Sequence, residues 1–225
     1  MVYSNTVQAV FLDRPNRFIA HVRIGDEIHT VHVKNTGRCR ELLLPGAEVI
    51  LQHSDASNRK TAYDLICVYK PNLGWVNIDS QVPNTVVSEW LHSQAFDVIR
   101  PEYTFGNSRV DFYLEKGDEK YLLEVKGCTL EMDGKGYFPD APSLRAAKHC
   151  RELAEASCMG YHCYIAFVIA MEQVNHVYPH TDRDPDFATA LAEAQAAGVE
   201  ILHIPCKVSQ DAIYVSPSYS YTIDK

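Results

Sequence analysis

The chain has 225 residues, of which 46% are hydrophobic and 22% are charged, and it carries a net charge of −8 at pH 7. This composition is that of an ordinary soluble globular protein, and it excludes a disordered or collagen-like chain. The longest apolar run, CYIAFVIAM, has nine residues, far fewer than the roughly 20 that a membrane-spanning helix needs. We therefore expect no association with a membrane.

The first 80 residues are expected to form a small β-barrel. Apolar alternation and turn signals predict short strands at 6–12, 18–24, 28–33, 48–52, 62–69 and 75–78. One short helix is predicted at 38–44, ending before Pro45 and Gly46. Five or six short strands with one small helix fit an OB-fold.

Residues 81–225 alternate between helix and strand patterns, which indicates an α/β layer. Helices are predicted at 83–95, with Pro83 near the start, at 143–157, with Ser143 as N-cap, and at 185–197, ending at Gly198. Strands are predicted at 99–105, around Ile165 and at 199–207. No long linker separates the parts, so we expect two closely packed domains, 1–80 and 81–225.

Charge is distributed unevenly between these two parts. Residues 1–80 contain nine Lys and Arg against eight Asp and Glu, whereas residues 81–225 contain twelve against twenty-one. The first part therefore suits a polyanionic partner better than the overall charge suggests. Part of the acidity of the second could be carboxylates that bind a metal.

The cysteines and the N-terminus indicate a cytoplasmic protein. The seven cysteines are scattered and form no C-x-x-C pair, which is typical of reduced thiols and not of a zinc site or a disulfide framework. The N-terminal MVYSNTVQAVFLDR has no basic region followed by an apolar core, so no signal peptide is expected.

The segment RVDFYLEKGDEKYLLEVKG, residues 109–127, reads as a β-hairpin. Both halves alternate with period two, and Gly117 at the first central position suits a type II′ turn. If Gly117 and Asp118 form the loop, Asp111 lies opposite Glu124 and Arg109 lies opposite Lys126. Both acids then point to the same face of the sheet.

Like charges opposite each other destabilise a sheet, so something must offset the two acids. One explanation is local neutralisation by Arg109 and Lys126. The other is a divalent cation such as Mg²⁺, which binds through one or two carboxylates and keeps several waters. The pattern Asp-x12-Glu-x-Lys leaves both explanations open.

Further charged residues are candidates for the same site. Glu89 borders the apolar stripe of helix 83–95, where a solvated glutamate is the alternative. Arg145 and Lys148 share one face of helix 143–157 with Glu152 and form either a salt-bridged surface or a phosphate-binding face.

Two other segments carry polar clusters. KNTGRCRELLLPG, residues 34–46, places Lys34, Arg38 and Arg40 around an Asn-Thr-Gly turn, which suits a phosphate contact or an ordinary charged loop. HVYPHTD, residues 176–182, has the spacing of a possible metal site, but without a helix to align its ligands we interpret it as a loop.

Several sequence blocks resemble the sugar fermentation stimulation protein family along nearly the whole chain. They are NTGRCRELLLPGAEV, VNIDSQVPN, GNSRVDF, LLEVKGCTL, FPDAPSLRAAKH and AGVEIL, in this order. The resemblance implies an N-terminal OB-fold followed by a restriction-endonuclease-like core of the PD-(D/E)xK type. One departure is Ala146, which stands where the family usually has a glycine after the arginine.

The resemblance also implies an activity and its residues. It implies a DNA/RNA nuclease, in which Asp111, Glu124 and Lys126 are the core catalytic residues and Glu89 is the acid of the first core helix. Contacts to the phosphate backbone carry no base information, so we expect low sequence specificity. Asp111, Glu124, Glu89 and the carbonyl of Val125 would bind Mg²⁺ or Mn²⁺. The predicted contacts to DNA or RNA are Lys34, Arg38, Arg40, Arg109, Arg145 and Lys148.

The alternative function is a non-catalytic DNA-binding regulator of sugar (maltose) utilisation genes, as the family's name implies. An intact acid–acid–lysine set and the lack of an evident helix-turn-helix recognition helix speak against it as the sole function. Oligomeric state cannot be read from the sequence, and a homodimer is one possibility.

Overall fold

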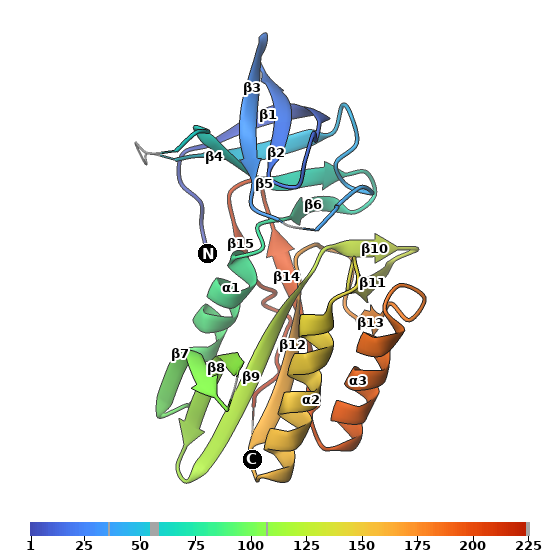
Figure 1. The fold of residues 1–225 in the computed structure, drawn as a ribbon. Coiled ribbons are helices and arrows are strands. Elements are labelled where there is room, and N and C mark those ends of the chain that lie inside the picture. The colour runs from blue at the N-terminus through green and yellow to red at the C-terminus, as the bar shows by residue number, and fades with distance from the viewer. Residues whose placement is uncertain (36, 55–58, 107, 224–225) are drawn as a thin grey trace.

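The computed structural model describes residues 1–35, 37–54, 59–106 and 108–223. Its N-terminal part is an OB-like β-barrel. The strands follow the order β3-β2-β1-β4-β5-β6, and a parallel pairing of β3 with β5 closes the sheet. It occupies the blue-to-cyan end of the molecule in Figure 1. The strands are β1 (Thr6–Asp13), β2 (Ile19–Ile24), β3 (Glu27–Val33), β4 (Glu48–His53), β5 (Tyr63–Lys70) and β6 (Gly74–Asn77).

The helix predicted at 38–44 is wrong, because the segment forms turns. Cys39 has a φ of +46°, and the N–H of Leu43 donates to the Cys39 carbonyl at 2.9 Å, closing a single turn. Left-handed backbone at a residue other than Gly prevents a helix from starting there. The apolar pattern arose because Leu42 and Leu43 are buried in the barrel core. Residue 36, the centre of the expected Asn-Thr-Gly turn, lies outside the described residues.

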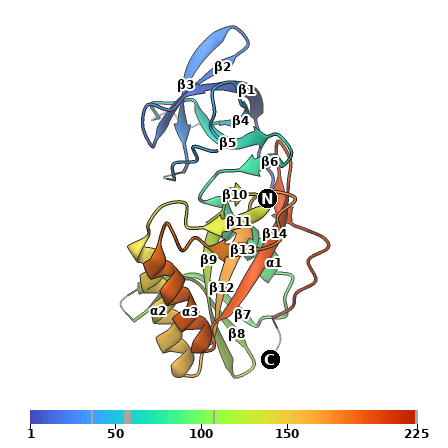
Figure 2. The ribbon, with the colours of Figure 1, turned by 90° about the vertical axis from the view of Figure 1, so that its right-hand side faces the viewer.

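The second part is a six-stranded sheet with helices on both faces, in the order β15-β14-β12-β9-β8-β7. β9, β12 and β14 run parallel, whereas β7, β8 and β9 form an antiparallel meander. Figures 1 and 2 show α1 on one face and α2 with α3 on the other. The elements are α1 (Val82–Leu91), β7 (Val98–Phe105), β8 (Ser108–Lys116), β9 (Glu119–Cys128), α2 (Leu144–Cys158), β12 (His162–Ile169), α3 (Pro185–Ala196), β14 (Glu200–Val208) and β15 (Ile213–Val215).

The alternation of β9 supplies both cores of this sheet. Leu123 packs with Trp90 of α1, whereas its neighbour Leu122 belongs to the core beneath α2 and α3, with Leu153 and Phe187. Successive side chains of a strand point to opposite faces, so β9 is buried on both sides. Any polar side chain of even number on β9, such as Glu124, is consequently directed into the α2 side of the molecule.

The local predictions for the hairpin and for α2 are confirmed. Lys116 pairs with Glu119, and Gly117 has a φ of +59° whereas Asp118 has no positive φ, as a type II′ turn requires. The hydroxyl of Ser143 accepts the N–H of Ala146 at 3.2 Å and caps α2.

A small sheet of β10 (Leu130–Met132), β11 (Lys135–Phe138) and β13 (Val177–Pro179) was not predicted. Its three strands are only three or four residues long, too short to show a clear alternation. β13 lies within the HVYPHTD segment that was interpreted as a loop.

All seven cysteines are free, and six of them are buried. Cys158, the last residue of α2, is the exposed one. Burial raises the pKa of the Cys39, Cys67 and Cys206 thiols to about 12, and it does the same for Cys128, Cys150 and Cys163. Within the described residues, no helix is long and apolar enough to cross a membrane.

Candidate functional site

The site begins where β8 and β9 part. The backbone pairing of β8 with β9 runs from the hairpin turn as far as Phe112 and Leu123. Asp111 and Glu124 are the first residues beyond this pairing. The N–H of Val125 donates to Oδ2 of Asp111 at 2.7 Å, so a carboxylate takes the place of a backbone acceptor.

The predicted opposition of Arg109 and Lys126 is not formed. Arg109 pairs with Thr104 of β7, and its Nε lies 2.8 Å from the carboxylate of Glu102. The parting of the strands explains the difference, because the simple register of the hairpin ends before Arg109. Of the two basic residues expected to neutralise the acids, only Lys126 does so, because Arg109 is paired with Glu102.

Asp111 is held by two donors in a low-dielectric environment. In addition to Val125, the Asn84 side-chain amide of α1 donates to Oδ1 at 2.8 Å. Burial, and then the negative charge of Glu124, raises the pKa of Asp111 above its usual value, while the two hydrogen bonds oppose the rise. Ionised Asp111 is consequently short of positive charge.

Glu124 is buried, and its two oxygens differ in their surroundings. Oε1 accepts Lys126 Nζ at 2.6 Å and also contacts Nδ1 of His149. Oε2 is fully buried and has no hydrogen-bond partner among the described residues. Burial raises the pKa of Glu124, but the bonds from His149 and Lys126 lower it by more, so its pKa lies below the usual value. Glu124 is therefore ionised at neutral pH, with one oxygen unsatisfied.

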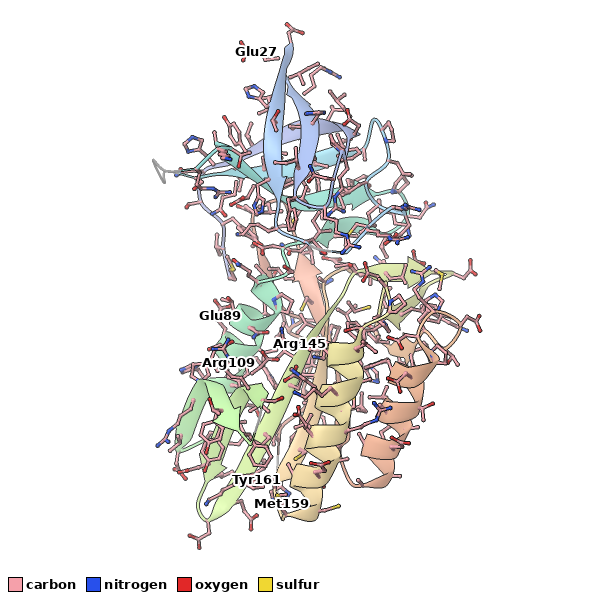
Figure 3. The ribbon with its side chains drawn as sticks, viewed as in Figure 1. Glu27, Glu89, Arg109, Arg145, Met159 and Tyr161 are labelled. Atoms are coloured by element: carbon pink, nitrogen blue, oxygen red, sulfur yellow. The ribbon has the colours of Figure 1, made fainter. Side chains whose placement is uncertain are left out.

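His149 is a residue of the site that the sequence analysis missed. It is 7% exposed, and Arg145 Nε, one turn earlier on α2, donates to its Nε2 at 3.4 Å. Because Nε2 accepts, the proton of the neutral ring is on Nδ1, which donates to Glu124. Figure 3 shows Arg145 at the upper end of α2, beside β9. The spacing of four between Arg145 and His149 was the available sequence signal.

The arrangement fits a divalent cation on chemical grounds. A buried, unpartnered carboxylate oxygen on Glu124 and a second carboxylate with a raised pKa both gain from a nearby positive charge. Hard cations such as Mg²⁺ are satisfied by one or two carboxylates and water. In the part of the chain that is described, no group of three or more His, Cys, Asp or Glu has the geometry of a metal site. Asp111 and Glu124 are two carboxylates whose charges interact, and their role as ligands stays a prediction, as does that of the Val125 carbonyl.

Glu89 is directed to another part of the molecule. Its carboxylate accepts the N-terminal ammonium of Met1 at 2.6 Å, and its side chain is 52% exposed. Glu89 follows Asn84 by five residues, which turns it by roughly 140° around the helix axis. Figure 3 shows Glu89 on the outer side of α1. Asn84, in the first turn of α1, is the residue of this helix that contacts Asp111.

Three of the predicted phosphate contacts are engaged in ion pairs. Lys34 Nζ lies 2.8 Å from Asp79, whose side chain is 1% exposed, so Lys34 neutralises a buried charge. Lys148 donates to Ser108 at 2.9 Å and lies 3.4 Å from Glu152, as the salt-bridged interpretation of this face expected. Arg109 is paired with Glu102, as described above. Lys34 in particular is 19% exposed and offers little surface to a ligand.

Arg38 and Arg40 line a hollow on the barrel, which we call the arginine hollow. It has a volume of about 310 Å³ and is lined by Arg14, Asn16, Arg17, Arg38, Arg40 and Leu43. The Arg14 guanidinium donates to four backbone carbonyls, including those of Gly37 and Arg38, and so fixes the loop. Among the described residues, the guanidiniums of Arg17, Arg38 and Arg40 have no carboxylate partner. Arg38 and Arg40 also line a neighbouring hollow with Glu41 and Asp140, but the lining of the arginine hollow itself contains no acidic residue, which favours an anionic ligand there.

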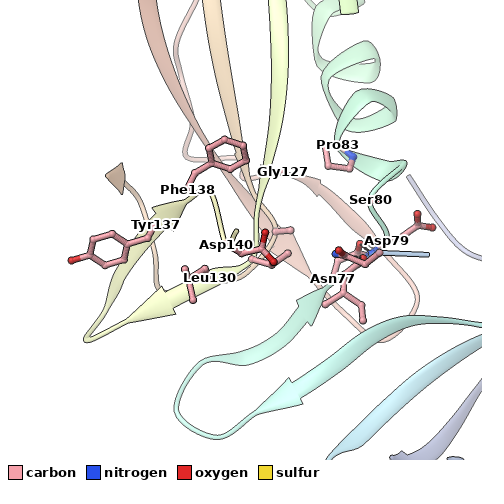
Figure 4. Close-up of a pocket in the computed structure, with 13 residues that line it drawn as sticks. Asn77, Asp79, Ser80, Pro83, Gly127, Leu130, Tyr137, Phe138 and Asp140 are labelled. Carbon is pink, nitrogen blue, oxygen red and sulfur yellow. Dashed lines mark hydrogen bonds between the residues drawn. The ribbon is translucent and has the colours of Figure 1, made fainter. Parts of the chain in front are cut away.

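A cavity of about 120 Å³ lies where the barrel meets the second part (Figure 4). Its lining includes Pro83, next to Asn84, and Gly127, next to Lys126. A Cβ at Gly127 would lie 2.8 Å from Cγ of Pro83, so glycine is required for α1 to approach β9 this closely. The remaining lining residues are Asn35, Asn77, Ile78, Asp79, Ser80, Thr129, Leu130, Tyr137, Phe138, Asp140 and Ala170.

Two family models match the chain. Residues 12–78 match the SfsA N-terminal OB domain, and residues 81–212 match the sugar fermentation stimulation protein RE domain. A sugar fermentation stimulation protein homolog from Desulfitobacterium hafniense (strain Y51) is 50% identical over 216 residues, covering 95% of this chain and 94% of the relative. A homolog of the same name from Clostridium botulinum (strain Hall) is 45% identical over 229 residues and covers 99% of both chains.

A solved structure also matches over nearly the full length. Pyrococcus furiosus SfsA in complex with Ca²⁺ aligns with a TM-score of 0.83 and 29% sequence identity. The alignment covers 96% of this chain and 95% of the archaeal protein. The arrangement of both parts of the molecule is therefore shared with that protein.

Proposed function

This chain belongs to the sugar fermentation stimulation protein family, and from the chemistry of its acid pair we propose that it is a metal-dependent nuclease that hydrolyses phosphodiester bonds of DNA or RNA. The single observation that carries the proposal is the buried Glu124 carboxylate, whose charge acts on Asp111 and whose Oε1 is held by two donors while Oε2 has no partner among the described residues.

The proposed cofactor is Mg²⁺ or Mn²⁺, held by Asp111 and Glu124 with water and the predicted carbonyl of Val125. When bound, such an ion polarises a phosphate oxygen and lowers the pKa of a bound water. The structure of Pyrococcus furiosus SfsA in complex with Ca²⁺ supports a site for a hard divalent cation in this family.

The residues of the chain have separate tasks in this proposal. Asn84 and the Val125 N–H fix the orientation of Asp111. Lys126 Nζ lies 2.6 Å from Glu124 and supplies a positive charge for the developing negative charge of the phosphate. Arg145, exposed at the start of α2 beside β9, is positioned to contact a phosphate of the strand. Glu89 has no part in this version of the site.

The arginine hollow is the proposed second contact to nucleic acid. Arg17, Arg38 and Arg40 meet the backbone phosphates, with the loop held by Arg14. Such contacts carry no information about base sequence. The proposed nuclease therefore has low sequence specificity and a strong dependence on salt.

The test is cleavage of labelled single-stranded DNA, double-stranded DNA and RNA with Mg²⁺, with Mn²⁺ and with chelator. Wild type should cleave at least one substrate with metal alone, and Asp111→Asn and Lys126→Ala should each abolish cleavage. Asp186→Asn and Lys207→Ala are matched controls, because both side chains form exposed ion pairs elsewhere. Equal cleavage by Asp111→Asn and wild type would refute the assignment.

The names of the relatives favour a second candidate, a DNA-binding regulator of sugar utilisation without catalysis. It predicts binding that is sequence-selective and independent of metal. Binding of one promoter sequence far above random DNA, with no cleavage in any metal, would favour the regulator over the nuclease.

A further inference from the structure

We infer that His149 is a positioning residue that holds one oxygen of Glu124 and thereby presents the other, Oε2, to the divalent cation. The inference rests on the cation site proposed above and assigns a role to a residue on a different element, α2. His149 itself is not a ligand in this arrangement.

The two donors to Glu124 Oε1 are not equivalent. Lys126 lies on the same strand, two residues further on, and its four-carbon stem can follow the carboxylate as it rotates. His149 comes from a helix with a capped N-terminus, and it is one of the buried residues of that helix. The imidazole therefore cannot follow Glu124, and it fixes the plane of the carboxylate.

Both nitrogens of His149 are already engaged. Nδ1 contacts Glu124 Oε1, and Nε2 accepts the Arg145 guanidinium at 3.4 Å. An imidazole ligand must direct one unprotonated nitrogen at the metal. Since Nε2 is the acceptor in the neutral ring and faces Arg145, neither nitrogen is available. A ring nitrogen bound to a carboxylate that itself binds a metal is a known way of orienting a ligand.

Holding Oε1 determines which oxygen remains for the ion. Oε2 is buried without a partner in the described part of the chain, so the protein bears the desolvation of that atom until a cation arrives. Without His149, the carboxylate can turn and share its oxygens between Lys126 and solvent. The cation site then loses its prepared oxygen, although both acids are still present.

The experiment measures Mn²⁺ binding by the EPR signal of free Mn²⁺, in the absence of nucleic acid. His149→Leu removes the donor, whereas His149→Asn keeps an amide N–H near the place of Nδ1. We expect His149→Leu to bind Mn²⁺ at least about 10-fold more weakly than wild type, and His149→Asn to recover most of that loss. Circular dichroism and thermal unfolding establish that each variant is folded.

His162→Leu is the matched control, because His162 also contacts a glutamate, Glu119, at 2.6 Å on the same strand β9 but at its other end. It should bind Mn²⁺ like wild type. In cleavage assays, His149→Leu should raise the Mn²⁺ concentration for half-maximal rate, and the rate of cleavage should recover at high Mn²⁺. A purely structural defect would not be rescued by added Mn²⁺.

The outcomes separate this inference from the proposed function. If wild type binds no Mn²⁺, the cation site itself is refuted. If wild type and a folded His149→Leu bind Mn²⁺ equally, the cation site stands and the role of His149 is refuted. Pulsed EPR that detects a directly coordinated ¹⁴N on Mn²⁺ in wild type, lost in His149→Leu, would make His149 a ligand and also overturn the inference.

Discussion

The N–H of Val125 and a carboxylate oxygen of Asp111 lie 2.7 Å apart and form a hydrogen bond across the point where β8 and β9 separate. Asp111 thus has two tasks. Its carboxylate satisfies a backbone donor that the sheet leaves without a partner, and it also faces Glu124. A substitution at this position can keep the first task and remove the second.

Asp111→Asn should separate stability from ion binding. The side-chain carbonyl of Asn can still accept from Val125, and the Asn84 amide can turn so that its carbonyl accepts from the new NH₂ group, while the repulsion that raises the pKa of Asp111 beside Glu124 disappears. In chelator, we expect the free energy of unfolding to stay unchanged or to rise by about 1 kcal/mol. Added Mn²⁺ should raise the melting temperature of wild type but not of this variant. A variant that Mn²⁺ still stabilises would contradict the prediction.

Gly127→Ala should disturb the site without removing a functional group. The new Cβ would lie 2.8 Å from Pro83 Cγ and push the start of α1, which carries Asn84, away from β9. We expect a loss of about 1–3 kcal/mol in unfolding free energy, as for other overpacked positions. Denaturant unfolding measures this loss.

The double variant Gly127→Ala/Pro83→Ala tests the cause. It removes the Cγ that the new methyl group would meet, and the remaining contact, to Cβ of Pro83 at 3.8 Å, is ordinary. The loss of unfolding free energy in the double variant should therefore be smaller than the sum of the losses in the two single variants. Strict additivity would show that the two residues do not interact as described.

Arg17→Ala, Arg38→Ala and Arg40→Ala should weaken nucleic-acid binding through lost charge. Each phosphate contact removed should lower the slope of log K against log salt by about 0.9 for duplex DNA or about 0.7 for a single strand. Fluorescence anisotropy over a range of salt measures the slope. Arg151→Ala is the control, because Arg151 is paired with Asp186 on the far side of α2, and its slope should equal that of wild type.

Lys34→Ala should behave differently from these three arginine variants. Removal of Lys34 leaves the nearly buried carboxylate of Asp79 without its cation, which costs about 3 kcal/mol for a buried pair. We expect a large loss of unfolding free energy and an unchanged salt slope in the fraction that folds. A stable Lys34→Ala protein with a reduced salt slope would contradict this prediction and show that Lys34 contacts a phosphate.

The protein should lose stability below pH 6.5 because of His203. Burial, with the nearby His176, lowers the pKa of His203 to about 4, and its Nδ1 accepts the N–H of Val177 at 3.2 Å. Above pH 6.5 the ring is neutral in both states. Between pH 6.5 and 4 only the unfolded chain takes up the proton. The free energy of unfolding therefore decreases as the pH is lowered, by up to about 2 kcal/mol for a partly exposed ring. Urea unfolding at several pH values should show a flatter profile for His203→Phe, which keeps the stacking on Phe167.

Local chemistry explains which features could be predicted from the sequence. Gly117 defines its turn by a positive φ that few other residues adopt, and Ser143 caps the helix that follows it. The alternation along β9 needs only the period of a strand. Each of these depends on a few neighbouring residues.

Predictions that depended on distant contacts were less successful. Glu89 has the right residue type, but packing sets the rotation of α1 and directs Asn84, not Glu89, to Asp111. The turn at Cys39 and the pairing of Lys34 with Asp79 arise from packing in the barrel. His149 stayed unnoticed because its spacing of four from Arg145 indicates only a shared helix face, whereas its contact with Glu124 spans 25 positions.

The exposure of Cys158 alone among the cysteines has a practical consequence. At neutral pH a maleimide dye should couple there, since the other six thiols are buried and hold their protons up to about pH 12. The dye lies thirteen positions after Arg145 on the helix, roughly 20 Å along the axis. Wild-type protein thus offers a native attachment point for a fluorophore, close enough to sense an oligonucleotide by energy transfer and distant enough to leave its binding undisturbed.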